Sequence, residues 1–159
     1  MDWIIWLLVV AFVLLFIYRR ATAGRRINSQ LNRQKAQEFL DQNSTRVGVI
    51  VTDSGLQLEV LQMGTGTVHP QEHDRVLVHY VGQLSNGTVF DSSVARNEPV
   101  AFPLNRVIRG WTEGLQLMVE GEKVRLFIPP DLGYGDQDMG VIPPGSLLIF
   151  DVELLKIEA

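Results

Sequence analysis

Two histidines four residues apart are the first residues of this sequence whose spacing suits catalysis. His69 and His73 enclose Glu72 in the order H-x-x-E-H, in which a helix presents two zinc ligands and a general base. The pattern works only on a helix, because there both imidazoles share one face. Pro70 and the nearby glycines favour a loop, and no third ligand stands in a convincing position. We therefore expect solvated loop residues here.

Glycine and serine motifs indicate catalysis just as weakly. Gly64 and Gly66 could begin a dinucleotide-binding loop, but the third glycine and the strand–helix–strand context are missing, which favours a turn. The chain has no cysteine, which excludes thiol chemistry. It also has no G-x-S-x-G motif, which excludes the nucleophile elbow of an α/β-hydrolase. Ser92 and Ser93 follow Asp91 without a histidine placed to activate them, so we expect turn or capping residues.

A scattered set of aromatic residues and one acid remains. Its members come from separate stretches of the chain: Tyr80, Phe90, Asp91, Trp111, Tyr134 and Phe150. In an unrelated domain such residues would simply form part of the core. If they met in one pocket, it would have aromatic walls and a single carboxylate without a cluster of metal ligands, and it would need no cofactor.

The elements that would position these residues are short strands and one short helix. Apolar and other side chains alternate from Val76 to Val81 with the period of a strand, and Asn86-Gly87 signals a tight turn. The one short helical stretch runs from Trp111 to Met118. Further strand-like runs cover residues 47–52, 56–62, 89–91, 123–128 and 147–157. This pattern predicts an α+β domain at 46–159, in which an antiparallel sheet wraps one helix.

The N-terminal segment reads as a membrane anchor. Residues 3–18 are apolar and uncharged, and as a helix they would span about 24 Å, slightly less than the hydrocarbon core of about 30 Å. A cleaved signal peptide ending near Ala21-Thr22-Ala23 would carry its positive charge before the run, whereas here it follows. We therefore expect a transmembrane anchor at 1–20. By the positive-inside rule, the arginines at 19, 20, 25 and 26 favour a cytoplasmic domain, with the periplasm as the alternative.

Residues 21–45 form a basic, polar segment that we expect to be a linker helix. Its thin apolar stripe consists of Ile27, Leu31, Ala36, Phe39 and Leu40. The segment reads as a solvated spacer or as a dimerisation or lipid-surface helix. The following domain carries eight basic and fifteen acidic side chains, a net charge of −7. Nucleic-acid binders need a basic face, so we expect no nucleic-acid partner.

Six short strings carry a resemblance to a known family. In order they are Val78-His79-Tyr80, Gly87-Thr88-Val89-Phe90-Asp91-Ser92-Ser93, Val107-Ile108-Arg109-Gly110-Trp111, Gly133-Tyr134-Gly135, Ile142-Pro143-Pro144 and Phe150-Asp151-Val152-Glu153-Leu154. Together they resemble the FKBP family of peptidyl-prolyl cis-trans isomerases over residues 47–157. The domain looks most like the bacterial branch that includes the macrophage infectivity potentiator.

This resemblance implies a fold and a set of site residues. The fold would be an antiparallel half-barrel of five or six strands around one helix, with a pocket between them. Trp111 would form the pocket floor, and Asp91 would be the polar group at the rim with Arg96 as its ion partner. The walls would come from Tyr80, Phe90, Val107, Ile108, Tyr134, Ile142 and Phe150, with Phe102 as a further neighbour.

The resemblance also implies function and partners. The chain would isomerise X–Pro bonds of proline-containing polypeptides during folding, and macrolides of the rapamycin type would block it. A scaffold that holds proline segments without turnover is the competing class. Val100, where some relatives carry an aromatic residue, and the acidic stretch 136–139 depart from the family pattern. The anchor would replace the family's dimerisation domain and place the protein in a bacterial inner membrane, which leaves the oligomeric state open.

Overall fold

The structure, a computed structural model, describes the backbone of residues 2–158 and the side chains of residues 11, 14, 15, 17 and 22–158. Its strands form one antiparallel sheet in the order β1-β2-β6-β7-β3-β4, with β5 paired to β3. The strands are β1 (Val49–Val51), β2 (Gln57–Gln62), β3 (Arg75–Leu84), β4 (Val89–Ser92), β5 (Val100–Pro103), β6 (Lys123–Ile128) and β7 (Leu148–Glu158). The α+β class and the antiparallel sheet are thus as predicted. The seven strands exceed the expected five or six.

The strand faces follow the alternation of the sequence. Along β3, Val76, Val78 and Tyr80 are buried while the residues between them are more exposed. β3 and β7 lie next to each other in the middle of the sheet and pair along almost their whole lengths. The inward-facing side chains form one hydrophobic core with those of the short helix α2 (Arg109–Gln116).

Two glycines let α2 lie close against β6. A Cβ atom at Gly110 would come within 2.6 Å of the Ile128 side chain, and one at Gly114 within 2.9 Å of Leu126. These glycines are four residues apart and therefore share one face of the helix. Two 3₁₀ turns, η1 (Leu104–Arg106) and η2 (Pro130–Leu132), flank the connections to α2 and β7.

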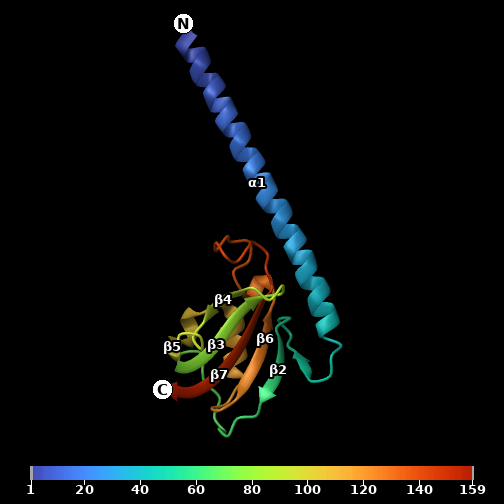
Figure 1. Cartoon of the computed structure of the whole chain (residues 1–159), viewed down its shortest axis with the longest axis vertical. Coiled ribbons are helices and arrows are strands. Elements are labelled where there is room, and N and C mark those ends of the chain that lie inside the picture. Colours follow the sequence, from blue (N-terminus) through green and yellow to red (C-terminus); the bar gives the residue numbers. More distant parts are fainter. Residues whose placement is uncertain (1, 159) are drawn as a thin grey trace.

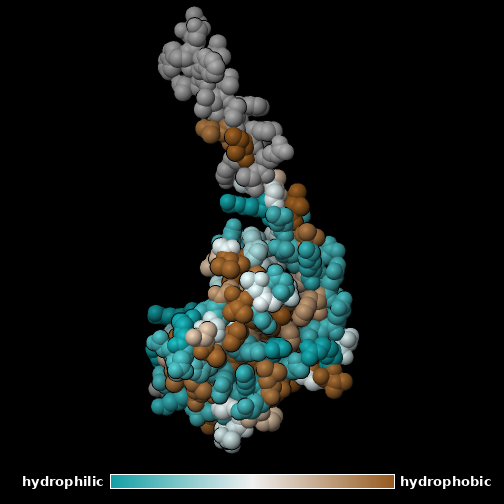
Figure 2. Space-filling view, in the orientation of Figure 1, coloured by the Kyte–Doolittle hydropathy of each residue, from teal (hydrophilic) through white to brown (hydrophobic). Residues whose placement is uncertain are grey.

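The N-terminal helix corrects the predicted arrangement of the first 45 residues. α1 runs unbroken from Asp2 to Asn43, so the transmembrane helix and the linker helix predicted separately are one element. Figure 1 shows its N-terminal half extending well beyond the sheet. Leu14, Leu15 and Ile17 on this half are exposed, and Figure 2 shows hydrophobic atoms in brown on this part of the helix.

The predicted membrane anchor and the membrane location built on it are wrong. In the part of the chain that the structure describes, no helix is both long enough and apolar enough to cross a membrane. Most side chains of residues 3–18 lie outside that part. The predicted anchor is too short, because an apolar run of about 24 Å does not reach across the hydrocarbon core of about 30 Å and the helix then continues into polar sequence.

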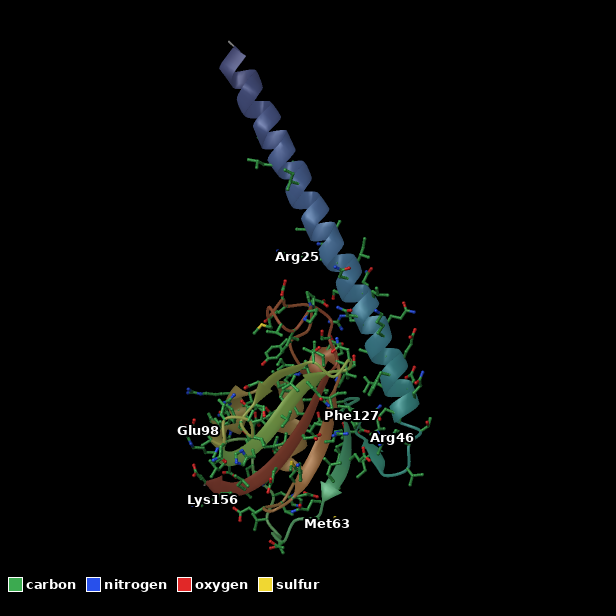
Figure 3. The ribbon with its side chains drawn as sticks, in the orientation of Figure 1. Arg25, Arg46, Met63, Glu98, Phe127 and Lys156 are labelled. Atoms are coloured by element: carbon green, nitrogen blue, oxygen red, sulfur yellow. The ribbon has the colours of Figure 1, made fainter. Side chains whose placement is uncertain are left out.

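The C-terminal part of α1 packs on the domain instead of forming a free spacer. Ala36 and Leu40 are buried against the sheet, and the Phe39 ring lies 5.9 Å from that of Phe127 on β6. Figure 3 labels Phe127 where β6 faces the lower end of α1. The members of this second core cluster are Ala36, Leu40, Phe127, Leu147 and Ile149.

Polar contacts complete this junction between α1 and the sheet. Asn43 donates to the Gln57 side chain over 2.8 Å, and Gln57 donates to the Leu40 carbonyl over 2.9 Å. Arg46, labelled just beyond the helix in Figure 3, pairs with Glu59 on β2 at 3.0 Å. The end of α1 is therefore attached to β2 as well as to β6.

Candidate functional site

A cavity of about 590 Å³ opens between α2, the sheet and the loop that follows η2. Ten of the eleven site residues predicted from the sequence line it, and Arg96 lies outside the lining. The structure adds Arg106, whose position directly before Val107 in the sequence was the available signal. The lining consists of Tyr80, Phe90, Asp91, Phe102, Arg106, Val107, Ile108, Trp111, Tyr134, Ile142 and Phe150. Val100, which departs from the family pattern, packs against the core and does not line the cavity.

Trp111 forms the base of the cavity. It is the least exposed aromatic residue of the lining, at 3%. Tyr80, Phe102 and Phe150 present their rings at steep angles to the indole, with ring centroids 5.3, 5.5 and 5.3 Å away. Such edge-to-face pairs are favourable because the positive edge of one ring meets the negative face of another. The base is therefore a rigid aromatic box.

The indole N–H of Trp111 is buried without a partner. Among the described residues, its Nε1 is the only buried side-chain nitrogen or oxygen that makes no hydrogen bond. A buried donor left unpaired costs about 1–3 kcal/mol. The base of the cavity thus combines apolar faces with one donor that the protein itself does not satisfy.

Gly82 allows two wall rings to come together behind Tyr80. A Cβ atom at this position would lie 2.6 Å from both the Phe90 and the Phe150 rings. These two rings stack edge to face with centroids 5.4 Å apart. Any side chain at residue 82 would therefore displace the wall that β4 and β7 build beside β3.

A charged network forms the rim. The Tyr80 hydroxyl donates to one carboxylate oxygen of Asp91, and Arg96 donates to the other and also to the Tyr80 oxygen. Burial acts to raise the pKa of Asp91, but the hydrogen bond from Tyr80 and the ion pair with Arg96 outweigh it and hold the pKa below its ordinary value. Burial first, and then donation to Asp91, raises the pKa of Tyr80. The rim thus holds a carboxylate and a neutral phenol over the neutral pH range.

The remaining polar wall is Tyr134, on the loop between η2 and β7. Its side chain is half-buried, and its hydroxyl makes no hydrogen bond to any residue within the described part of the chain. Ile142, 7% exposed, lies on the same loop and also faces the cavity. The cavity therefore offers a free hydroxyl beside an apolar wall.

The other motifs do not join this site. Residues 69–73 form a loop, where His69 contacts the Met118 carbonyl and His73 contacts Asn105. The two imidazoles thus have separate partners. Ser93 differs from expectation, because His79 lies 3.0 Å from its hydroxyl. Ser93 is fully buried, however, and its hydroxyl bonds the backbone of Tyr80, so it joins β3 to β4.

Family models match both parts of the chain. One described as FKBP-type peptidyl-prolyl cis-trans isomerase matches residues 66–155. The chain belongs to this family. A second model, described as the domain amino terminal to FKBP-type peptidyl-prolyl isomerase, matches residues 15–60. This second match covers part of the predicted anchor, so replacement of the FKBP amino-terminal domain by an anchor is not supported.

Individual FKBP-type relatives agree. FkpA of Aeromonas hydrophila is 54% identical over 127 residues, which are 80% of this chain and 47% of that protein. The FKBP-type 22 kDa isomerase of Escherichia coli is 50% identical over 142 residues, which are 89% of this chain and 68% of that protein. The crystal structure of FkpA from Escherichia coli superposes with a TM-score of 0.83 at 40% identity, covering 87% of this chain and 64% of that one.

Two consequences follow from these FKBP relatives. The chain spans about half the length of the first of them, FkpA of Aeromonas hydrophila, of which it covers 47%. The matched residues 66–155 include every residue that lines the cavity.

Proposed function

We propose that this chain catalyses cis–trans isomerisation of X–Pro bonds in polypeptides, in the cavity above Trp111. The observation that carries the proposal is the combination of an aromatic base, a charged rim and a free Tyr134 hydroxyl in one cavity of about 590 Å³. No covalent bond breaks in this reaction. A site without a nucleophile is therefore sufficient.

The barrier to be lowered is the resonance of the amide bond. Rotation costs about 18–20 kcal/mol, because twisting removes the partial double bond. The twisted amide has a less polar carbonyl than the planar one. An aromatic cavity that excludes water therefore favours the twisted form, which is differential binding of the transition state.

Each predicted site residue has a role in this proposal. Trp111 supports the proline ring from below, and Tyr80, Phe90 and Phe150 exclude water around it.

The polar residues have other roles. Tyr134 donates a hydrogen bond to a substrate carbonyl and orients the peptide. Asp91 provides a fixed charge near the twisting bond, with Arg96 holding it in place. The apolar substrate-binding contacts come from Phe102, Val107, Ile108 and Ile142.

A protease-coupled assay with an X–Pro peptide tests the proposal. We expect the chain to raise the first-order rate constant of the cis-to-trans step. A metal chelator should leave this effect unchanged, since the proposed mechanism uses no metal or other cofactor. Binding of the peptide without acceleration would assign the chain to the scaffolds instead. Loss of activity on chelation would contradict the mechanism.

We further propose that macrolides of the rapamycin type occupy the same cavity. The support is the aromatic box around Trp111, which suits a large apolar ring. Replacing Trp3 and Trp6 by phenylalanine leaves Trp111 as the only tryptophan of the chain's three, so its fluorescence reports on the cavity alone. We expect a saturable fluorescence change that parallels inhibition. A titration with neither effect would refute this proposal.

A further inference from the structure

The loop that carries Tyr134 and Ile142 is closed at its base by a short neck. The Gly145 N–H donates to the Gly135 carbonyl over 2.8 Å, which joins the two sides of the loop directly after Tyr134 and encloses Ile142. Inside the loop, Gln137 N–H donates to the Tyr134 carbonyl and Met139 N–H donates to the Ile142 carbonyl. The position of the neck therefore determines where both wall residues lie.

Helix α1 contacts the loop on both sides of this neck. On the incoming side, Arg33 pairs with Asp131 and Asp136, each at 2.8 Å, and Ser29 donates to the same Asp136 carboxylate. On the outgoing side, Asn32 donates to the Pro144 carbonyl over 2.8 Å. These contacts join residues about one hundred positions apart in the sequence, and they come from one turn of the helix.

The backbones also touch at this point. Gly145 has a φ of 75°, and a Cβ atom on it would lie 2.4 Å from the Ser29 carbonyl oxygen. Ser29 is 6% exposed, although the helix around it is mostly solvated. The helix and the loop thus meet at van der Waals distance, and the ion pairs lie beside a packed contact.

From these contacts we infer that Arg33 is a positioning residue, through which α1 fixes the loop that carries Tyr134 and Ile142. The helix turn from Ser29 to Arg33 acts as a clamp on the loop neck. This clamp explains one residue of the acidic stretch 136–139, which departs from the family pattern, because Asp136 accepts the hydrogen bonds from Arg33 and Ser29. The catalytic consequence rests on the proposed isomerase function, whereas the clamp itself does not.

The charges support the clamp. Donation to Asp136 and then to Asp131 raises the pKa of the Arg33 guanidinium. Donation from Arg33 and then from Ser29 lowers the pKa of Asp136. The two carboxylates are well exposed, so the pairs alone contribute little. The effect of these ion pairs is to hold the loop neck at one position along α1.

The test compares Arg33→Gln with Arg46→Gln in the full chain. Arg46 is a matched control. It lies just beyond the end of α1 and, like Arg33, forms an ion pair with a carboxylate, that of Glu59. Glu59 does not line the cavity. One measurement is hydrogen exchange of the amides of residues 135–145. The other is kcat and KM of the isomerase reaction, with thermal unfolding to check that both variants stay folded.

For Arg33→Gln we expect exchange of the Gly145 and Met139 amides to rise about tenfold, while amides of β3 and β7 keep their rates. We expect kcat/KM to fall about threefold to tenfold, mainly through KM, because a mobile Tyr134 must be ordered on binding. Arg46→Gln should leave both measurements near wild type. Arg33→Lys should recover part of the lost kcat/KM, since lysine restores the positive charge but lacks the forked guanidinium that reaches both carboxylates.

The outcomes separate the clamp from the proposed function. Unchanged loop exchange in Arg33→Gln would overturn the clamp. A loosened loop with wild-type kinetics would overturn the inference that Arg33 is a positioning residue for catalysis. Equal effects in Arg33→Gln and Arg46→Gln would also overturn it, because they would reflect general loosening of α1. An inactive wild-type chain would instead overturn the isomerase proposal, and the exchange measurement would still decide on the clamp.

Discussion

Asp91 occupies an unusual position for a carboxylate beside an aromatic cavity, because both of its oxygens are already paired. Tyr80 and Arg96 each take one of them, and the side chain stays 41% exposed. A group so fully engaged is suited to supplying a fixed field and is poorly placed to accept a proton. Its role is therefore best examined by removing the charge.

Replacing Asp91 by alanine should lower kcat/KM by about tenfold to a hundredfold, corresponding to about 1.4–2.7 kcal/mol of transition-state stabilisation. The change removes the rim charge and leaves Arg96 without its partner. The protease-coupled assay measures it, with circular dichroism to show that the fold is kept. Asp53→Ala, at an exposed residue outside the cavity, is the control. Full activity in folded Asp91→Ala would show that the site is misassigned.

Replacing Phe150 by tyrosine should reduce kcat/KM by a similar factor, about tenfold to a hundredfold. Phe150 is 5% exposed and its ring contacts both Trp111 and Phe90. The added hydroxyl would enter an apolar wall, where an unpaired polar group costs about 1–3 kcal/mol. Peptide affinity should fall along with turnover. Wild-type kinetics in this variant would mean that the wall does not contact the substrate.

The catalytic efficiency should be flat between about pH 5 and pH 8. The pKa of Asp91 lies below its ordinary 3.8, so its charge is present above that value and is lost only as the pH falls through the lowered pKa. The pKa of Tyr80 lies above its ordinary 10.0, so the neutral phenol is lost only in strong alkali. A protease-free exchange assay measures the profile. An acid limb with a midpoint near pH 6 would contradict this assignment.

At the scale of elements, the closeness of α2 to β6 depends on glycine. Gly110→Ala should destabilise the fold by about 1–3 kcal/mol, because the new methyl group would overlap the buried Ile128 side chain. Chemical denaturation measures the change. Gly24→Ala on α1 is the matched control, since nothing lies within 4 Å of its Cβ position. It should be neutral or slightly stabilising, because alanine favours a helix over glycine. Equal losses in both variants would show that packing on β6 is not the cause.

The sheet could be predicted where the alternation of side chains is long. The run predicted at 123–128 matches β6, and that at 147–157 matches β7 within one residue. β5 escaped prediction because Val100–Pro103 is short and all its residues are partly buried, so no alternation appears. Nine site residues could be predicted because the family strings contain them. Phe102 lies outside the strings and was expected only as a neighbour of the pocket, and Arg106 belongs to no string.

The contacts of α1 could not be predicted for a different reason. Ser29, Asn32 and Arg33 are ordinary polar residues of a helix, and their partners lie about a hundred positions away. The apolar stripe also misled, because Ile27 and Leu31 are exposed while Ala36 and Leu40 are buried. Periodicity shows which residues share a face, but it does not tell where along a helix that face finds a partner.

At the scale of the whole molecule, this difference along α1 gives a paired test. Leu40→Ala should cost about 2–5 kcal/mol of unfolding free energy, because it leaves a cavity against the sheet. Leu31→Ala, on the same helix but 47% exposed, should change stability by less than about 0.5 kcal/mol. Denaturant titration of both variants measures the contrast. Equal effects would show that α1 does not dock on the domain in solution.

The place of β7 in the sheet has a consequence for the synthesis of the protein. β7 is the last described strand along the chain, yet it lies between β6 and β3 in the middle of the sheet. A ribosome extends the chain at about 5–20 residues per second, and until residues 148–158 have emerged the two flanking strands lack their shared neighbour. Phe150, one wall of the cavity, arrives in the same stretch. A nascent chain that stops before β7 therefore exposes unpaired strand edges, so premature termination creates an aggregation hazard instead of a partly active enzyme.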